Sequence, residues 1–336
     1  MNLRKLLLSA TALSAVAMSV SVANAADIAR PVVRRPVVAA VPYYNWTGFY
    51  IGGHFGGGWG RNEFSETACG GSPGLICGPV WRLHALETPT IGLGGLGGDV
   101  GSHQFSGALG GFQVGYNWQI GRFLIGVEGQ FSWSDMKGDH QNTTSNTHVF
   151  AEPADAFFEL FQGTNSDRLY SKVKNFGDIA ARLGLVGGAE GRTLFYVKGG
   201  GGYAKTDYTL VQQFSAGRIS LAPFSQAASL NGGGEFTDSA TRWGPMAGVG
   251  LEFALFDGWT AKVEYDHLFL GTKSVDLTGG QNFTLRNNGI PDTLVTPGSA
   301  GGTRTFDVSQ DINIIKLGLN YRFGNYYAAP APFVTK

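Results

Sequence analysis

The sequence predicts an all-β protein, namely an eight-stranded antiparallel up-and-down transmembrane β-barrel with four long extracellular loops and three short periplasmic turns. Three observations predict this fold. Apolar and polar residues alternate with a period of two in eight separate segments. The connections between these segments alternate between short turns and long polar stretches. The 52 glycines, the 12% of aromatic residues and the 15% of charged residues favour many strands with tight turns over helices.

The eight segments share one pattern, in which large apolar residues occupy one face and glycine or polar residues occupy the other. The third segment is the clearest, because Phe123, Ile125 and Val127 alternate with Gly126 and Glu128. In chain order, the apolar faces run over Phe49–Trp59, Ala108–Trp118, Phe123–Trp133, Ile179–Leu185, Phe195–Tyr203, Trp243–Phe253, Trp259–Phe269 and Ile315–Phe323.

The connections between the eight segments differ sharply in length. Three are short and lie around residues 120–122, 187–192 and 256–258. The other four are long and polar, covering about 62–104, 135–172, 206–240 and 271–310. Outer-membrane barrels have short turns on the periplasmic side and long loops outside. We therefore expect both ends of the barrel domain to lie in the periplasm.

The polar faces combine charge with glycine, which indicates a narrow interior and not a solvent-exposed face. Eight strands leave only enough room for side chains to fill the barrel. Charges in such a space are costly unless they pair with one another, so a packed, salt-bridged lumen is expected. The inward charges predicted to form this network are Glu128, Asp178, Arg182, Lys198, Glu252, Lys262, Glu264, Asp266, Lys316 and Arg322.

Aromatic residues gather at both ends of the apolar faces, as in the aromatic girdles of membrane barrels. A soluble barrel has no need of two such rows, and the middles of the apolar faces carry no charge. The girdle near the periplasmic edge is expected at Trp118, Phe123, Phe195, Trp259 and Phe323. The girdle near the outer edge is expected at Trp59, Trp133, Tyr203, Trp243 and Phe269.

The beginning of the chain indicates export. Residues 1–25 resemble a cleaved signal peptide, with Arg4 and Lys5 before an apolar run and a small-x-small site at Ala23–Ala25. Residues 26–45 are expected to be a proline-rich periplasmic linker, residues 46–323 the barrel, and residues 324–336 a periplasmic tail. No later segment approaches the roughly 18 apolar residues that a membrane helix needs.

Cys69 and Cys77 are the two cysteines of the chain. Because an exported protein meets an oxidising compartment, a disulfide between them that closes a short loop is the expected state, and two free thiols are the alternative. A metal site is not expected, since two cysteines fall short of four ligands. Removing the signal leaves 23 basic against 25 acidic residues, which gives no reason to expect a nucleic-acid partner.

Three further patterns carry little chemistry. The glycine spacing in 92–97 matches a dinucleotide fingerprint, but no helix pattern follows it, so a flexible loop is expected. Four histidines in the long connections could bind haem iron or a metal, although their spacing matches no standard site and surface histidines are the simpler reading; they are His84, His103, His140 and His148. Asp266 and His267 are adjacent on a strand, point to opposite faces, and so predict no catalytic pair.

The segment Asn45–Gly53 resembles the opening strand of the small outer-membrane β-barrel proteins of alphaproteobacteria, often called porin-family or outer-membrane immunogenic proteins. Gly126–Gly129, Ala261–Tyr265 and Gly318–Phe323 are similar to strand motifs of the same family. The resemblance covers the signal, the linker and all eight strands, but not the loops. Family barrels commonly finish on the last aromatic residue, whereas residues 324–336 follow Phe323 here.

The resemblance implies an abundant, antigenic surface protein of the outer membrane, without catalytic residues and without a cofactor. Family roles include envelope integrity and contact with the host or environment, and this structural and surface-interaction role is the expected function. The alternative is a narrow porin-like channel or an uptake protein for haemin or a small solute. The expected partners are outer-membrane lipids and lipopolysaccharide, the barrel-assembly machinery during insertion, and host or environmental surface ligands at the loops.

Overall fold

The computed structural model describes residues 43–71, 82–84, 90–92, 99–152, 157–220, 227–256, 258–288 and 293–327. The predicted signal peptide, linker residues 26–42, Cys77 and most of the predicted tail lie outside these described residues. So do residues 93–97 of the glycine-rich motif. Among the residues that the structure describes, no helix is long and apolar enough to cross a membrane.

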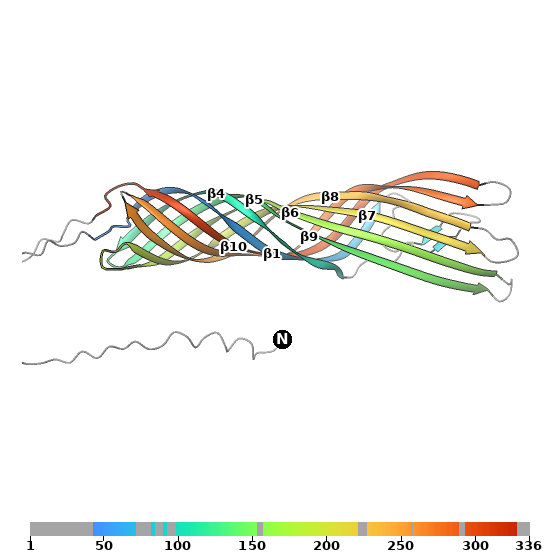
Figure 1. The fold of residues 1–336 in the computed structure, drawn as a ribbon, viewed down its shortest axis with the longest axis horizontal. Helices are drawn as coiled ribbons and strands as arrows, with labels where there is room; N and C mark the ends of the chain where they lie inside the picture. Colours follow the sequence, from blue (N-terminus) through green and yellow to red (C-terminus); the bar gives the residue numbers. More distant parts are fainter. Residues whose placement is uncertain are drawn as a thin grey trace, which may run out of the picture. The chain divides into compact units, whose positions relative to one another are not determined.

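Eight strands form a closed antiparallel ring, so the predicted barrel is confirmed (Figure 1). Around the ring the order is β1-β10-β9-β8-β7-β6-β5-β4, and β4 pairs with β1 to close it. The barrel strands are β1 (Gly48–Gly71), β4 (Asp99–Ile120), β5 (Phe123–Glu152), β6 (Phe157–Gly187), β7 (Thr193–Ser220), β8 (Ala227–Phe256), β9 (Trp259–Asn288) and β10 (Thr293–Arg322). The short strands β2 (Arg82–His84) and β3 (Thr90–Gly92) form a separate two-stranded sheet.

The three predicted short turns join β4 to β5, β6 to β7 and β8 to β9. Glycine is needed in all three because the backbone enters the left-handed region, with φ of 63° at Gly121, 82° at Gly188 and 83° at Gly258. These turns lie at the same end of the barrel as the first and last described residues (Figure 1).

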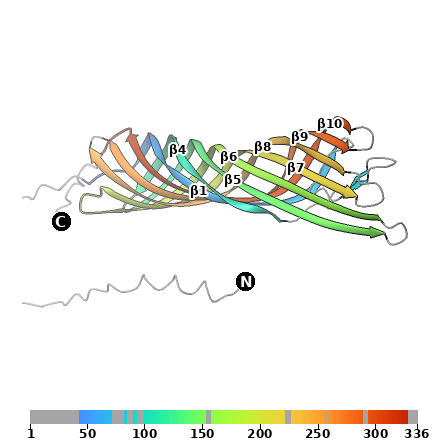
Figure 2. The same ribbon diagram turned by 45° about the vertical axis from the view of Figure 1, so that its right-hand side comes forward.

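The four long connections differ in form from the prediction, because most of their residues continue the strands. β5 runs to Glu152 and β6 begins at Phe157, well inside the stretch expected to be a loop. β7 and β8, and β9 and β10, are extended in the same way. The resulting hairpins project far beyond the rest of the barrel in both ribbon views (Figures 1 and 2).

In these extensions the outer face of the wall becomes polar, and the inner face carries more apolar side chains than it does around the charged network. Charged side chains such as those of Lys172 and Arg168 are exposed on the outer face, while the inner face combines many large apolar side chains with some buried polar ones. The buried inner cluster consists of Phe64, Leu169, Tyr208, Leu210, Phe236, Ala240, Val275, Leu277, Ala300, Phe306 and Val308. A wall surrounded by water buries its apolar face inward. The many Gly, Asn and Asp residues, which disfavour strands, make the same stretches look like loops in the sequence.

The ends of the barrel domain fold together across the short-turn end. The backbone N–H of Tyr44 donates to Glu190 O at 2.8 Å, and that of Asn45 donates to Tyr326 O at 2.9 Å. Tyr44 also pairs with Tyr327 in an isolated antiparallel bridge. The residues just after the closing strand therefore pack against the segment that precedes β1.

Candidate functional site: the charged lumen

The candidate site is the interior of the barrel between its short-turn end and its middle. Every second residue of each strand points inward, and the structure places all ten charged residues predicted for the lumen there. Each is at most 9% exposed. They come from six strands: Glu128 from β5, Asp178 and Arg182 from β6, Lys198 from β7, Glu252 from β8, Lys262, Glu264 and Asp266 from β9, and Lys316 and Arg322 from β10.

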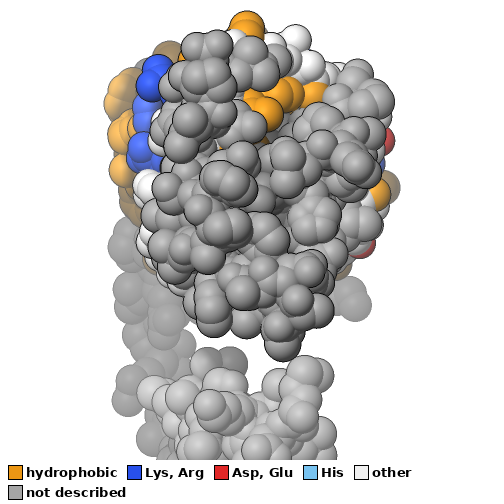
Figure 3. Space-filling model, turned by 90° about the vertical axis from the view of Figure 1, so that its right-hand side faces the viewer, with side chains coloured by type: hydrophobic (Ala, Val, Ile, Leu, Met, Phe, Trp, Pro, Cys, Tyr) orange, Lys and Arg blue, Asp and Glu red, His pale blue; other side chains and the backbone are white. Residues whose placement is uncertain are grey.

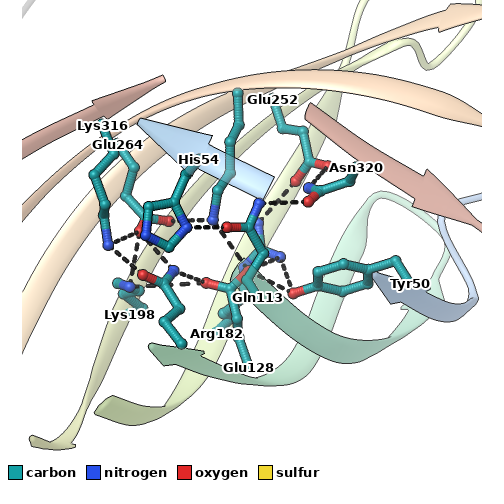
Figure 4. A network of polar contacts seen from close by, with 12 residues as sticks. Tyr50, His54, Gln113, Glu128, Arg182, Lys198, Glu252, Glu264, Lys316 and Asn320 are labelled. Carbon is teal, nitrogen blue, oxygen red and sulfur yellow. Dashed lines mark hydrogen bonds and ion pairs between the residues drawn. The ribbon is translucent and has the colours of Figure 1, made fainter. Parts of the chain in front are cut away.

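Glu264 is the centre of this network (Figure 4). Its carboxylate lies 2.9 Å from Lys198 Nζ, 3.0 Å from Lys316 Nζ and 3.1 Å from Lys262 Nζ. The hydroxyl of Tyr196 donates to it at 2.6 Å. Three cations and one hydroxyl therefore compensate a carboxylate that is 1% exposed, as a buried charge requires.

Glu128 and Glu252 bind the guanidinium of Arg182 from two sides. Arg182 donates to Glu252 at 2.9 Å and lies 3.4 Å from Glu128. Its guanidinium carbon is 3.8 Å from the centre of the Tyr196 ring, a cation–π geometry. Lys262 Nζ approaches Glu128 to 3.2 Å. Arg182 is itself completely buried, so its side chain links β6 to β5 and β8 across the lumen.

Two aspartates extend the network toward the middle of the barrel. Asp266 lies 2.5 Å from Lys316 Nζ and 3.2 Å from Lys198 Nζ. Asp178 lies 3.5 Å from Lys198 Nζ. The joined set contains five carboxylates and four cations, so its charges nearly balance. Balanced, directly paired charge leaves little unmatched field to attract or guide an ion through the lumen.

Arg322 lies apart from the other nine charges, which corrects the expectation that all ten pair with one another. Its guanidinium donates to Thr47 O at 2.7 Å, and its carbon lies 5.1 Å from the ring centres of Tyr44 and Tyr326. The physical reason is its position at the end of β10. At that position the folded terminal segments place a backbone carbonyl and two aromatic rings next to the guanidinium, and no carboxylate of the described network lies within ion-pair distance.

Uncharged residues complete the network, and the charge pattern alone did not single them out. Tyr50 donates to Glu128 at 2.7 Å, and Gln130 donates to Glu264 at 2.8 Å. His54 contacts both Ser132 and Gln113. The phase of the alternation could have found these residues, because they share the inward face with the charges.

A second ion cluster lies inside the barrel nearer to the hairpin end, in the stretches expected to be loops. Arg304 donates to Glu66 at 2.7 and 3.0 Å and to Asp167 at 3.3 Å. Arg304 is 1% exposed, so this cluster is also internal. Sequence reasoning missed it, because a loop assignment removes the inward and outward faces that make such a cluster recognisable.

Apolar layers lie on both sides of the central network. On β6, for example, Arg182 is placed between Val186 toward the short turns and Phe176 toward the extensions, and all three are buried. The layer at the short-turn end contains Tyr44, Trp46, Leu124, Val186, Leu194, Tyr196 and Ala254. The layer above the network contains Phe105, Leu109, Met136, Val173, Phe176, Ala180, Ala204, Met246, Leu268, Leu270, Ile312 and Ile314.

The ten residues predicted for the aromatic girdles lie on the outer face in two rows. Eight of them are more than 40% exposed, namely Trp59, Trp118, Phe123, Trp133, Phe195, Trp243, Phe269 and Phe323. Tyr203 and Trp259 are partly exposed, and each packs against a neighbouring ring, at 5.1 Å from Trp243 and 5.3 Å from Tyr321. Between the rows, residues such as Val127, Val197 and Val249 leave an exposed apolar belt.

The other candidate residues are placed as follows. Cys69 lies near the end of β1 and takes part in a disulfide, while Cys77 lies outside the described residues, so their pairing stays a prediction. His103 is buried in β4, with Nε2 at 2.7 Å from Ser171 Oγ. Asp266 faces the lumen, whereas His267 faces outward with Nδ1 at 2.9 Å from Asn313 Oδ1.

The side chains of His84 and His148 are outside the part of the chain that the structure describes in full, and the side chain of His140, on β5, is half-buried. Within the described residues, no group of three or more His, Cys, Asp or Glu side chains is arranged to hold a metal ion.

Comparisons with known proteins agree with this architecture. A family model described as "Outer membrane protein beta-barrel domain" matches residues 11–323. The 31 kDa outer-membrane immunogenic proteins of Brucella melitensis biotype 1 and Brucella suis biovar 1 are each 28% identical to the chain over 311 residues. The match covers 92% of this chain and 97% of each relative.

Two solved structures are also similar in part. The attachment invasion locus protein Ail of Yersinia pestis has 11% sequence identity and a TM-score of 0.28, with 80% of this chain and 99% of that chain covered. OprG of Pseudomonas aeruginosa has 10% identity and a TM-score of 0.32, with 84% and 99% covered.

Proposed function

Because the chain belongs to the outer-membrane protein β-barrel domain family, we propose that it serves the envelope as a closed structural barrel that presents its long hairpins to the surroundings. Its resemblance to the small outer-membrane barrels of alphaproteobacteria is confirmed, and its location is the cell outer membrane. The short turns then face the periplasm, and the hairpins project outside.

The filled lumen is the observation that carries this proposal. An ion crossing the barrel would have to pass the buried layer of Trp46 and Tyr44, the paired charges around Glu264, and the apolar layer that includes Phe176 and Met136. Trp46 is 1% exposed and its indole N–H donates to Gly191 O at 2.8 Å. Dense paired charge between two apolar layers favours a structural core over a channel.

The extended hairpins support the surface-interaction part of the proposal. They carry charged and hydroxyl side chains on a long outer wall, such as the exposed pair of Arg168 and Asp139. Binding residues are commonly placed on exposed segments that a rigid scaffold positions. Host or environmental ligands would therefore meet the hairpins, and no catalytic role is included in this proposal. The barrel-assembly machinery would be a partner only during insertion.

Solute flux into liposomes tests whether the barrel is closed. Liposomes that contain the purified, folded protein are expected to swell in small sugars or amino acids no faster than protein-free liposomes, because paired charges and apolar side chains fill the described part of the lumen. Liposomes with an open general porin provide the positive control. Swelling that rises with the amount of folded protein and depends on solute size would contradict the closed barrel and would support the narrow channel instead.

A further inference from the structure

The lipid-facing wall has a hollow of about 430 Å³ on the outer side of β4 to β8. Three glycines from adjacent strands, Gly129, Gly177 and Gly201, contribute to it. Phe131, Tyr203 and Trp243 border it. A Cβ atom added at Gly201 would meet no heavy atom within 4 Å, so the space there is open. An apolar hollow of this size in a membrane-facing surface fits a hydrocarbon chain.

A cluster of basic side chains lies directly beyond this hollow, on the side of the extracellular hairpins. We call it the basic patch; its cations are Lys137, Lys172, Lys174 and Lys205, and its acidic neighbours are Asp135 and Asp207. Four cations against two carboxylates leave an excess of positive charge. Lys205 takes no part in an ion pair with any described residue.

The strand register ties the basic patch to the hollow. Trp133 pairs with Asn175, and Asn175 pairs with Lys205, which follows the hollow's Tyr203 by two residues on the same face. Two β-bulges lie at this level, one in β5 after Trp133 and one in β6 after Val173. Bulges redirect side chains, and here the inserted residues Asp135 and Lys174 are both exposed on the outer wall.

The opposite side of the barrel has the reverse charge. On β1, β9 and β10, the charged side chains just beyond the outer girdle are Arg61, Glu63, Lys273, Asp276, Asp307 and Asp311. Four of these six residues are acidic. Among the described residues at this level, positive charge is therefore concentrated beside the hollow. In the end-on view of Figure 3, Lys and Arg side chains gather at one side of the wall with hydrophobic side chains beside them.

We propose that the hollow and the basic patch together form a binding site for one molecule of lipopolysaccharide, the phosphorylated glycolipid of the outer leaflet. An acyl chain would occupy the hollow, and the phosphate groups would bind the lysines. Basic side chains at a membrane surface attract anionic headgroups, and lysine binds phosphate as a point charge. The inference rests on the orientation in the proposed function, in which the hairpins face outward, and not on the closed lumen.

Native mass spectrometry of the full-length folded protein, with diphosphorylated lipid A as the probe, tests this site. The protein is expected to retain one lipid A molecule. Replacing three patch lysines, K172Q/K174Q/K205Q, is expected to weaken binding by about tenfold or more, since each cation contributes to the attraction. Two replacements on the opposite side, R61Q/K273Q, are expected to leave binding unchanged, and the double patch variant K172Q/K205Q removes the same number of cations for direct comparison. Lipid A without phosphates is expected to bind the original protein and the triple variant equally.

A glycine pair tests the hollow separately. Gly201→Leu fills the open space and is expected to weaken lipid A binding, whereas Gly53→Leu on the outer face of β1 is expected to have no effect. A Cβ at Gly53 would approach only Gly111 O, at an ordinary 3.7 Å, so both variants are expected to fold. Equal binding by the patch, opposite-side and glycine variants would overturn the site, even if the liposomes remained impermeable. Swelling with intact lipid A binding would instead refute the closed lumen alone.

Discussion

Replacing Arg182 with methionine is expected to destabilise the folded barrel by about 3–5 kcal/mol, because removing one partner of a buried ion pair leaves the other charge uncompensated. Arg182 is the cation that pairs with Glu252, at 2.9 Å, and both side chains are buried. After the substitution, Glu252 keeps hydrogen bonds from Thr260 and from Asn320 but has no cation within ion-pair distance among the described residues. Urea unfolding in lipid vesicles, followed by tryptophan fluorescence, measures the change.

The exposed pair of Arg168 and Asp139 supplies a matched control for this prediction. Arg168 donates to Asp139 at 2.8 Å, but both side chains are nearly half exposed. Arg168→Met is therefore expected to cost only about 0–1 kcal/mol. The double variant Arg182→Met/Glu252→Gln should recover part of the lost stability, since it removes the orphaned charge. Equal effects of Arg182→Met and Arg168→Met would show that the lumen charges are not paired as described.

Arginine in the middle of the exposed belt is expected to have the second largest effect. Val249 is 53% exposed on the outer face of β8, about midway between Trp243 and Phe253. Val249→Arg is expected to destabilise the barrel by about 2–4 kcal/mol in a bilayer, the cost of an arginine at the midplane. The same urea titration in vesicles measures it, and heat-modifiable migration on a gel verifies that the variant folds.

Thr278 provides the control, because it is an exposed β-branched residue on β9 beyond the outer girdle. Thr278→Arg places the same side chain in water and is expected to change the stability by about 0.5 kcal/mol or less. A Val249→Arg variant as stable in vesicles as Thr278→Arg would show that the belt does not face lipid. The difference in stability between the two variants thus shows whether lipid or water surrounds the belt, because the introduced side chain is the same in both.

The membrane-spanning half of the fold could be predicted from the sequence because one simple rule governs it. Successive side chains on a strand point to opposite faces, so the alternation of Ile125 and Val127 with Glu128 identifies wall and lumen together. The same rule places Glu264 and Lys198 on the inward face of their strands, so the sequence predicts that both lie in the lumen. A lipid surround demands an apolar outer face throughout, which makes the pattern strong and continuous.

The strand extensions were not predicted, because strands surrounded by water show a weaker alternation of apolar and polar residues than strands surrounded by lipid. Arg304 and Glu66 lie on inward faces of strands, but their neighbourhoods are rich in Gly, Ser and Thr and resemble loops. The folded terminal segments escaped for another reason. The contact of Arg322 with Tyr44 joins residues at opposite ends of the domain, and neither strand periodicity nor charge pattern reports such a contact.

The sequence also could not predict which charged residues pair with one another within the lumen. Alternation places Lys262 and Lys316 on the same interior face, but the partner of each depends on strand tilt and register. In the structure both lysines form ion pairs with Glu264, whereas Glu252 forms its ion pair with Arg182. Sequence reasoning thus identifies the members of the network, and the three-dimensional register decides its connections.

Single-channel recording in a planar lipid bilayer tests the central claim most directly, because it detects one open path through one barrel. With the folded full-length protein, and with insertion verified by protease protection of the barrel, we expect no discrete and stable conductance steps. The layered lumen around Glu264 and Trp46 accounts for that result. Large, stable, water-filled conductance steps that scale with the amount of inserted protein would contradict it.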